Sequence, residues 1–334
     1  MNHDIIAIGG SAGAIEVLLG LVGDLPANLP ASVFVVVHSA PDRGSALPEL
    51  LSHRGPLPAS HPLHDEKILP GRIYVAPPDA HLLVRHGAME VVRGPRENGH
   101  RPAVDALFRS ASAAYGSRVI GVVLSGYLDC GTAGMMSIKA RGGLAVAQAP
   151  GSAVAKEMPG SVVAKVEVDY VVHPIELPGL LLRLVTTPAA ATEVPRREIV
   201  QMEGKLEGTR AELVCPSCQG VLTETESSGF HLFRCHVGHA FSLESLVREQ
   251  GEEMERALWA ATRSLEEGAA LSGRLAATEK AIDLRRRFQE KQATQLQQAS
   301  LIRDVLLQGQ RLSPADATII AELSEAASAP RGRS

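Results

Sequence analysis

The sequence carries little net charge of either sign. Lys and Arg number 33 and Asp and Glu 37, so the formal net charge of the 334 residues is −4. Nucleic acids and anionic membranes attract strongly basic surfaces, and this composition argues against both as partners. Hydrophobic residues make up 45% of the chain, which suffices for a buried core, and the length predicts two or three structural units.

A secretion signal and a disulfide framework are also missing. The apolar stretch 5–22 has no basic segment ahead of it and is interrupted by Glu16 and several glycines. We therefore expect a buried strand and helix here rather than a signal peptide. Three of the four cysteines lie between positions 215 and 235, with spacing typical of a metal site rather than of disulfides. These absences predict a cytoplasmic protein without direct membrane insertion.

Short β-branched runs alternate with helical patterns up to about residue 185. The expected strands are residues 5–8, 33–37, 73–76, 119–124, 144–147 and 170–172. Near-continuous apolar strands separated by helices predict an α/β domain with a doubly wound, mostly parallel sheet and helices on both faces. Segments 82–84 and 89–92 predict a hairpin, which would make one edge of the sheet mixed.

The composition changes after residue 185. Residues 186–212 are rich in Thr, Ala, Pro and charged side chains, as in a linker. Residues 213–241 hold the three clustered cysteines. Residues 242–325 repeat apolar side chains at helical spacing, which predicts one long helix or a helical hairpin. We expect residues 326–334 to be a disordered tail.

The strongest chemical signal in residues 1–185 is the motif GGSAG at 9–13. It follows an expected strand, precedes an expected helix and fits the Gly-x-Ser-x-Gly elbow, whose glycines permit a tight turn that exposes the serine oxygen. The backbone N–H of Ala12 would then face an oxyanion at the helix N-terminus. Alternatively, the turn merely packs tightly or binds a phosphate. A dinucleotide site fits worse, because Gly-x-Gly-x-x-Gly is absent.

A serine nucleophile needs a base, and His38 follows the apolar run 33–37. Neighbouring parallel strands end at the same edge of a sheet, which would place His38 beside Ser11. A histidine at a strand end is often structural, however, and the chain has twelve histidines, His100 among them. Other segments of the sequence are needed to decide which histidine is the base.

Five segments together supply that context. In chain order they are IAIGGSAGAIE (6–16), VVVH (35–38), RPAVDALFRSA (101–111), LSGYLDCGTAGM (124–135) and EMP (157–159). They resemble the catalytic domain of the chemotaxis protein-glutamate methylesterases over nearly all of residues 4–185. The resemblance implies a hydrolase that removes methyl groups from γ-glutamyl esters of chemoreceptors, and that also deamidates glutamine at the same kind of site.

The resemblance also assigns roles by position. Ser11 would be the nucleophile and His38 its base, and the backbone N–H groups of Ala12 and Tyr127 would face the oxyanion. This chemistry needs no cofactor. The family usually carries a phospho-receiver domain ahead of the esterase; Ser11 lies too near the first residue for one, so we expect none.

The third triad position departs from the family. The catalytic Asp should stand directly before Gly131, and Cys130 stands there instead. A neutral thiol accepts an imidazole N–H poorly, so we expect weakened catalysis unless the neighbouring Asp129 takes the role. The alternative is a catalytically weak or inactive scaffold that binds a receptor or its methyltransferase.

The clustered cysteines predict a structural zinc site. Cys215 with Cys218, and Cys235 with His239, have the spacing of two zinc knuckles, which would close a tetrahedral Cys3His site. His236 is a poorer fourth ligand because it directly follows Cys235. The residues between the knuckles, 222–233, predict a hairpin and hence a zinc ribbon, without the basic and aromatic surface of a nucleic-acid binder.

The helical region would be very long as a single helix. Residues 243–308 would then extend about 100 Å. We therefore expect a hairpin or pairing with a second copy of the chain as a homodimer.

Overall fold

A computed structural model describes residues 2–38, 44–188, 208–227 and 230–309. The chain divides into two compact units, Met1–Leu246 and Val247–Ser334.

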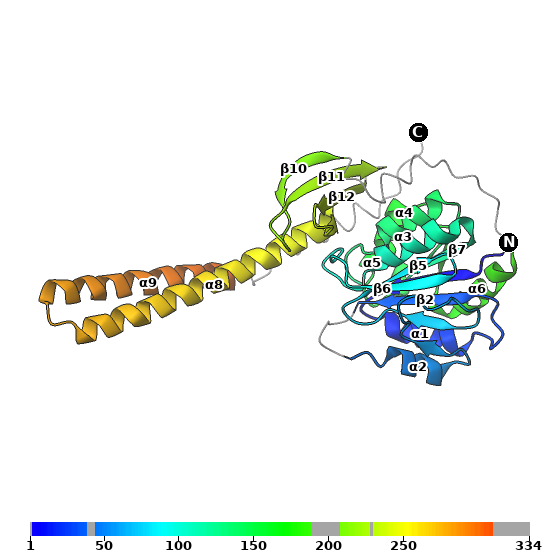
Figure 1. Ribbon diagram of the computed structural model, residues 1–334, viewed down its shortest axis with the longest axis horizontal. Helices are drawn as coiled ribbons and strands as arrows, with labels where there is room; N and C mark the ends of the chain where they lie inside the picture. Colours follow the sequence, from blue (N-terminus) through cyan, green and yellow to red (C-terminus); the bar gives the residue numbers. More distant parts are fainter. Residues whose placement is uncertain (1, 39–43, 189–207, 228–229, 310–334) are drawn as a thin grey trace. The chain divides into compact units, whose positions relative to one another are not determined.

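The first unit is built on a seven-stranded parallel sheet (Figure 1). The strands are β1 (Ile5–Gly10), β2 (Ser32–Val37), β3 (Ala59–Ser60), β4 (Ile73–Val75), β7 (Val119–Val123), β8 (Leu144–Gln148) and β9 (Tyr170–Val172). They follow the order β3-β4-β2-β1-β7-β8-β9, with parallel pairing throughout. All six strands expected in the sheet are confirmed, whereas the two-residue β3 is too short to leave a periodic pattern.

Among the described residues, three helices cover each face of this sheet (Figure 1). On one face lie α1 (Ala14–Gly23), α2 (Leu47–Arg54) and α6 (Leu177–Thr186), and on the other α3 (Val104–Tyr115), α4 (Thr132–Ala140) and α5 (Glu157–Lys165). Short 3-10 turns cover Gly116–Arg118, Pro150–Ser152 and Pro174–Glu176. Because both faces are covered, β1, β2 and β7 are buried along nearly their whole length, as their apolar runs predicted. The doubly wound α/β fold is confirmed.

The expected hairpin consists of β5 (His81–Arg85) and β6 (Ala88–Val92). It forms a two-stranded sheet of its own, so the prediction of a mixed edge in the main sheet was wrong. Leu82, Val84 and Met89 are buried in the same core as Phe108 of α3. The hairpin therefore buries its apolar side chains against α3, and it needs no pairing with the main sheet to do so.

A four-stranded antiparallel sheet follows within the same unit. Its strands are β10 (Thr209–Val214), β11 (Val221–Ser227), β12 (Phe230–Cys235) and β13 (Ala240–Ser242). The pairing of β11 with β12 confirms the hairpin expected between the cysteine knuckles. Strand β10 begins inside the stretch assigned to the linker; residues 189–207 of that stretch lie outside the described residues. We call residues 209–242 the ribbon.

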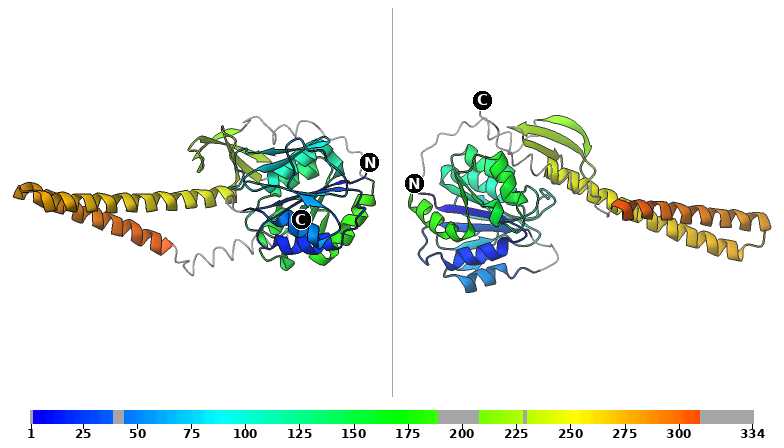
Figure 2. Two further views of the ribbon diagram at one scale, coloured as in Figure 1. Left: turned by 60° about the horizontal axis from the view of Figure 1, so that its bottom comes forward. Right: turned by 180° about the vertical axis from the view of Figure 1, so that it is seen from behind.

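The second unit is a helical hairpin, which decides between the two arrangements expected for this region. Helix α8 (Leu243–Thr278) turns into α9 (Ile282–Gly309), and the views of Figure 2 agree that the helices run side by side. A Cβ atom on Gly268 would lie 2.5 Å from the Gln295 amide, and one on Gly273 would lie 2.6 Å from the Gln292 amide. The amides of Gln295 and Gln292 on α9 therefore pack directly against the backbone of α8 at these glycines. The expected tail, 326–334, lies outside the described residues.

None of the helices described is both long enough and apolar enough to span a membrane.

Candidate active site and metal cluster

Ser11 lies in a tight turn between β1 and α1. The turn depends on Gly13, whose φ of 81° is in the left-handed region that a side chain disfavours. The Ser11 N–H donates to the carbonyl oxygen of Ser125 at 2.8 Å. The serine is thus tied to the loop that follows β7, the strand next to β1 in the sheet.

His38 lies at the adjacent strand end. Strands β1 and β2 pair in parallel with Gly10 opposite Val37, and the His38 N–H donates to the Gly10 carbonyl oxygen at 3.1 Å. Ser11 and His38 both line one cleft of about 660 Å³. The other lining residues are Ala12, Gly13, Ile15, Glu16, Leu19 and Val37. The structure therefore brings the expected nucleophile and the expected base to one cavity.

The loop after β7 approaches Ser11 closely because Gly126 has no side chain. A Cβ atom on Gly126 would lie 2.9 Å from the Ser11 Cβ and 2.1 Å from the Met158 sulfur. The next residue is Tyr127. In the part of the chain that the structure describes, the N–H groups of Ala12 and Tyr127 donate to no other protein atom. Two donors close to the Ser11 turn are thus available for an oxyanion.

Cys130 is buried, with 1% of its surface exposed, and is not among the residues that line the cleft. Burial raises the pKa of its thiol well above the ordinary value, and the charge of Asp105 adds to this effect. Three hydrogen-bond donors face the sulfur: the N–H groups of Val104 and Asp105 at the start of α3, and the side-chain amide of Asn98. Donors at a helix N-terminus favour an anion, but burial and the charge of Asp105 outweigh them here, so the thiol stays protonated.

Asp129 points to the C-terminal part of the first unit. Its Oδ1 accepts hydrogen bonds from Ser242 Oγ at 2.7 Å and from Ser245 Oγ at 3.2 Å, while Lys165 Nζ lies 3.9 Å from its Oδ2. Burial and the neighbouring Glu244 carboxyl raise the pKa of Asp129 to about 8. The Asp129 carboxylate therefore binds the end of the ribbon and the first turn of α8.

Three residues around the site were not predicted. The buried Asp105 accepts from the N–H groups of Gly131, at 3.0 Å, and Gly134, at 2.6 Å, which fixes the start of α4. It lies within the segment RPAVDALFRSA, so the resemblance signalled it without giving a role. Asn98 donates to Asp105 Oδ2 at 2.9 Å. His100 stacks on His38, with ring centroids 3.6 Å apart and planes 13° apart.

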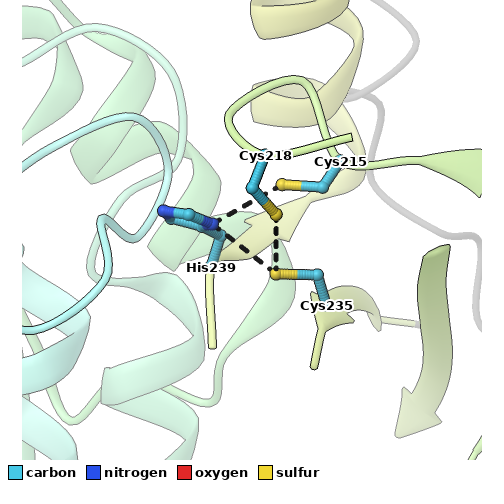
Figure 3. A group of neighbouring side chains, drawn as sticks. All are labelled: Cys215, Cys218, Cys235 and His239. Carbon is cyan, nitrogen blue, oxygen red and sulfur yellow. Dashed lines mark hydrogen bonds between the residues drawn. The ribbon is translucent and has the colours of Figure 1, made fainter. Parts of the chain in front are cut away.

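The structure also gathers the four expected metal ligands (Figure 3). The Cys218 and Cys235 sulfurs are 3.6 Å apart, and His239 Nδ1 lies 3.7 Å from the Cys215 sulfur and 3.5 Å from that of Cys235. Tetrahedral zinc bonded to sulfur at about 2.3 Å and to nitrogen at about 2.0 Å holds its ligand atoms about 3.5–3.8 Å apart. The donor set and the spacing both fit zinc, and His236 is not part of the group.

Comparison with known proteins agrees with this fold. The family model described as CheB methylesterase matches residues 6–181. The chain belongs to the CheB methylesterase family. A solved member of this family, the CheB methylesterase catalytic domain of Thermotoga maritima, is 31% identical and superposes with a TM-score of 0.54, covering 55% of this chain and 100% of its own.

Curated CheB relatives match the same part of the chain. A putative protein-glutamate methylesterase/protein-glutamine glutaminase of Leptospira interrogans is 34% identical over 185 residues, which are 55% of this chain and 96% of that protein. Protein-glutamate methylesterase/protein-glutamine glutaminase 4 of Myxococcus xanthus is 37% identical over 145 residues, which are 43% of this chain but 41% of that protein. The chain thus spans less than half of the Myxococcus relative.

Proposed function

We propose that this chain is a protein-glutamate methylesterase, which hydrolyses γ-glutamyl methyl esters of a chemoreceptor or a related signalling protein and deamidates glutamine at similar positions. The observation that carries the proposal is the meeting of Ser11 and His38 in one cleft at the ends of β1 and β2. Membership of the CheB methylesterase family, and the names of the relatives, give the substrate class.

In the proposed mechanism Ser11 Oγ attacks the ester carbonyl while His38 accepts its proton. The N–H groups of Ala12 and Tyr127 stabilise the tetrahedral oxyanion, and His38 then returns the proton to the leaving methanol. Water, whose proton passes to His38, then attacks the acyl-enzyme. The proton returns to Ser11 Oγ as the ester bond to Ser11 breaks, and the substrate protein leaves with a free glutamate side chain. Deamidation follows the same steps with ammonia as the leaving group.

Cys130 supports a second candidate function. A neutral thiol at the position of the family's aspartate cannot supply the negative charge that a carboxylate gives the imidazole in the transition state. The alternative is a scaffold with weak or no catalysis that keeps the methylesterase surface to bind a receptor or its methyltransferase.

We further propose that the Cys3His cluster binds a structural zinc ion through Cys215, Cys218, Cys235 and His239. Four protein ligands leave no open position on a tetrahedral ion, so its contribution would be the folding of the ribbon rather than catalysis. Reduced thiols at these positions fit a protein of the cytoplasm, where disulfides are rare.

The helical hairpin is proposed to pair with a second copy of the chain. Each helix exposes large apolar side chains, among them Trp259 and Leu275 on α8, and Leu296 and Val305 on α9. Two such hairpins would bury these side chains in a four-helix bundle.

Methanol release from a methylated receptor fragment tests the proposed function. Wild type and Ser11→Ala are compared at equal concentration, with His53→Ala, an exposed histidine of α2, as the control. Release that disappears with Ser11→Ala alone supports the esterase. Equal release by wild type and Ser11→Ala contradicts it, and binding of the fragment without any release favours the scaffold.

A further inference from the structure

The ribbon is bound to the esterase domain through Asn98. The Asn98 N–H donates to the Ala240 carbonyl oxygen at 2.7 Å, and Asn98 Oδ1 accepts from the Ser242 N–H at 2.9 Å. Ala240 and Ser242 are the ends of β13, and Glu97 pairs with Ala240 as a parallel bridge. The segment 96–98 is thus held by the ribbon as an added strand would be.

Asn98 also reaches the loop that carries Cys130. Its side-chain amide donates to Asp105 and faces the Cys130 sulfur. Asp105 in turn accepts from the Gly131 N–H. Only 6% of Asn98 is exposed and its φ is 51°, a backbone conformation that asparagine tolerates better than most residues. One buried amide therefore joins β13, the start of α3 and the loop after β7.

The same segment places His100 on His38. Glu97 and His100 form a short bridge that closes the turn between them. The His100 N–H donates to the Glu97 carbonyl oxygen (N to O, 2.9 Å), and the Glu97 N–H donates to the His100 carbonyl oxygen (3.1 Å). The next residue, Arg101, is held by two hydrogen bonds that its guanidinium donates to the Asp79 carboxylate, one of them at 2.9 Å. The His100 ring comes to lie flat against His38, the proposed base.

We propose that His100 is a positioning residue for His38, and that the ribbon holds His100 in place through Asn98. This inference rests on the proposed function, since it concerns the base of the esterase reaction. In a serine triad, a carboxylate fixes the orientation of the imidazole. Here the residue at that position is a protonated thiol, and the ring of His100 stacked on His38 restricts rotation of the His38 imidazole. The ribbon is then a structural part of the catalytic site.

The ligand cluster stands directly before the strand that makes these contacts. His239 is followed at once by Ala240, and the Cys235 N–H donates to the His239 carbonyl oxygen at 3.0 Å. Loss of metal from Cys235 and His239 should therefore loosen β13 and, through Asn98, the segment 96–101.

Labelling of Ser11 by a fluorophosphonate tests the positioning of His38 without a protein substrate. We compare wild type, His100→Ala, His100→Phe and, as the matched control, His53→Ala. Because small displacements of a catalytic group cost up to about 100-fold in rate, His100→Ala should slow labelling by about 10- to 100-fold. In a separate assay with the methylated receptor fragment, it should lower kcat with little change in KM. Phenylalanine can stack flat and should keep most of the rate. A wild-type rate for His100→Ala, or an equal loss in His100→Phe, overturns the positioning role.

Amide hydrogen exchange in the full-length protein tests the role of the ribbon. Wild type, His239→Ala and His236→Ala are compared before and after a zinc chelator. Exchange at residues 96–101 should accelerate in His239→Ala and in chelated wild type, with slower labelling of Ser11, while His236→Ala matches untreated wild type. Unchanged exchange at 96–101 after the metal is lost overturns the link.

These readouts separate the inference from the proposed function. If wild type neither labels at Ser11 nor releases methanol, the proposed function fails. The ring resonances of His38, followed by NMR across its titration, then decide the inference, since His100→Ala should shift them whether or not the protein is an esterase. Identical His38 resonances in wild type and His100→Ala overturn it.

Discussion

Asp129 Oδ1 accepts a hydrogen bond of 2.7 Å from the hydroxyl of Ser242, which joins the loop after β7 to the end of the ribbon. Asp129 directly precedes Cys130, so this contact with the ribbon also constrains the backbone at the position where the family's catalytic Asp is expected. The same loop holds Leu128 at a φ of 63°, a conformation that costs a residue with a side chain about 1–2 kcal/mol. The anchor at Asp129 thus holds a strained turn in place.

Substitution of Asp129 distinguishes an anchor from a triad member. Asp129→Asn keeps an oxygen that can accept from Ser242 and Ser245, so we expect kcat within about threefold of wild type. A triad carboxylate changed to its amide would instead lose about 10⁴-fold. Asp129→Ala leaves two hydroxyls without their acceptor and should lower the free energy of unfolding by about 1–3 kcal/mol. Urea denaturation and methanol release measure the two effects, and a 10⁴-fold loss in Asp129→Asn would return the carboxylate to the triad.

The attachment of the ribbon should weaken as the pH rises. Burial and Glu244 raise the pKa of Asp129 to about 8, while Lys165 acts in the opposite direction. In the unfolded chain the carboxyl has its ordinary pKa of about 4. The folded state therefore binds an extra proton, and its stabilising contribution declines between about pH 4 and pH 8.

Thermal unfolding at pH 6, 7 and 8 measures this dependence. Glu244→Gln removes the like charge and should flatten it, whereas Glu212→Gln, an exposed residue of β10, should not. A stability that rises with pH over this interval in wild type, or equal slopes in wild type and Glu244→Gln, would contradict the assignment.

Cys130→Asp should increase esterase turnover. The N–H groups of Val104 and Asp105 and the amide of Asn98 already face this position, and they would stabilise a carboxylate. We expect kcat to rise at least about tenfold, within the limit of about 10⁴-fold that an orienting carboxylate supplies. Cys130→Ser, which remains neutral, is the control. If Cys130→Asp folds but shows no gain over wild type, a carboxylate at position 130 does not orient His38. The result would then favour either another orienting residue or the scaffold function.

The metal should be one zinc ion per chain, held by His239 and not by His236. Elemental analysis of purified wild type and His236→Ala should give one equivalent. His239→Ala should bind zinc far more weakly, since it breaks a closed Cys3His site. Equal zinc contents in the two histidine variants would exclude His239 as the ligand.

The helical hairpin should make the protein dimeric. Light scattering on the full-length chain should give twice the mass expected from the sequence, and Leu275→Lys should shift it toward the monomer. Asp283→Asn, a change at an already polar position of α9, serves as the control. A monomeric mass for wild type at micromolar concentration would refute the pairing.

Much of the fold follows from local patterns in the sequence. Strands β1, β2 and β7 are runs rich in β-branched residues, and the Ser11 elbow is a strand-turn-helix motif complete within a few residues. Its partner His38 could be found because parallel strands end at a common edge. The grouping of Cys215, Cys218, Cys235 and His239 could be predicted in the same way, since knuckle spacing is a local property.

The support around the site could not be predicted, because it depends on contacts between distant segments. Asn98 meets Ser242 across 144 positions of the chain, and Asp129 meets Ser242 across 113. Neither polar residue has a periodicity or a motif that points to its partner. His100 was one of twelve histidines, and only the docked segment 96–101 distinguishes it from the rest.

The central position of β1 has a consequence for how the protein is made. Strand β1 leaves the ribosome well before β7, yet it pairs at one edge with β2 and at the other with β7, where Ile5 meets Val119. The Ser11 turn also needs the Ser125 carbonyl, so it cannot close until the chain has grown past that residue. Sheets with such distant pairings fold slowly and expose apolar strands meanwhile. Apolar strands that stay exposed during synthesis are surfaces that chaperones bind, and the turn that holds Ser11, the proposed nucleophile, closes only after β7 has been made.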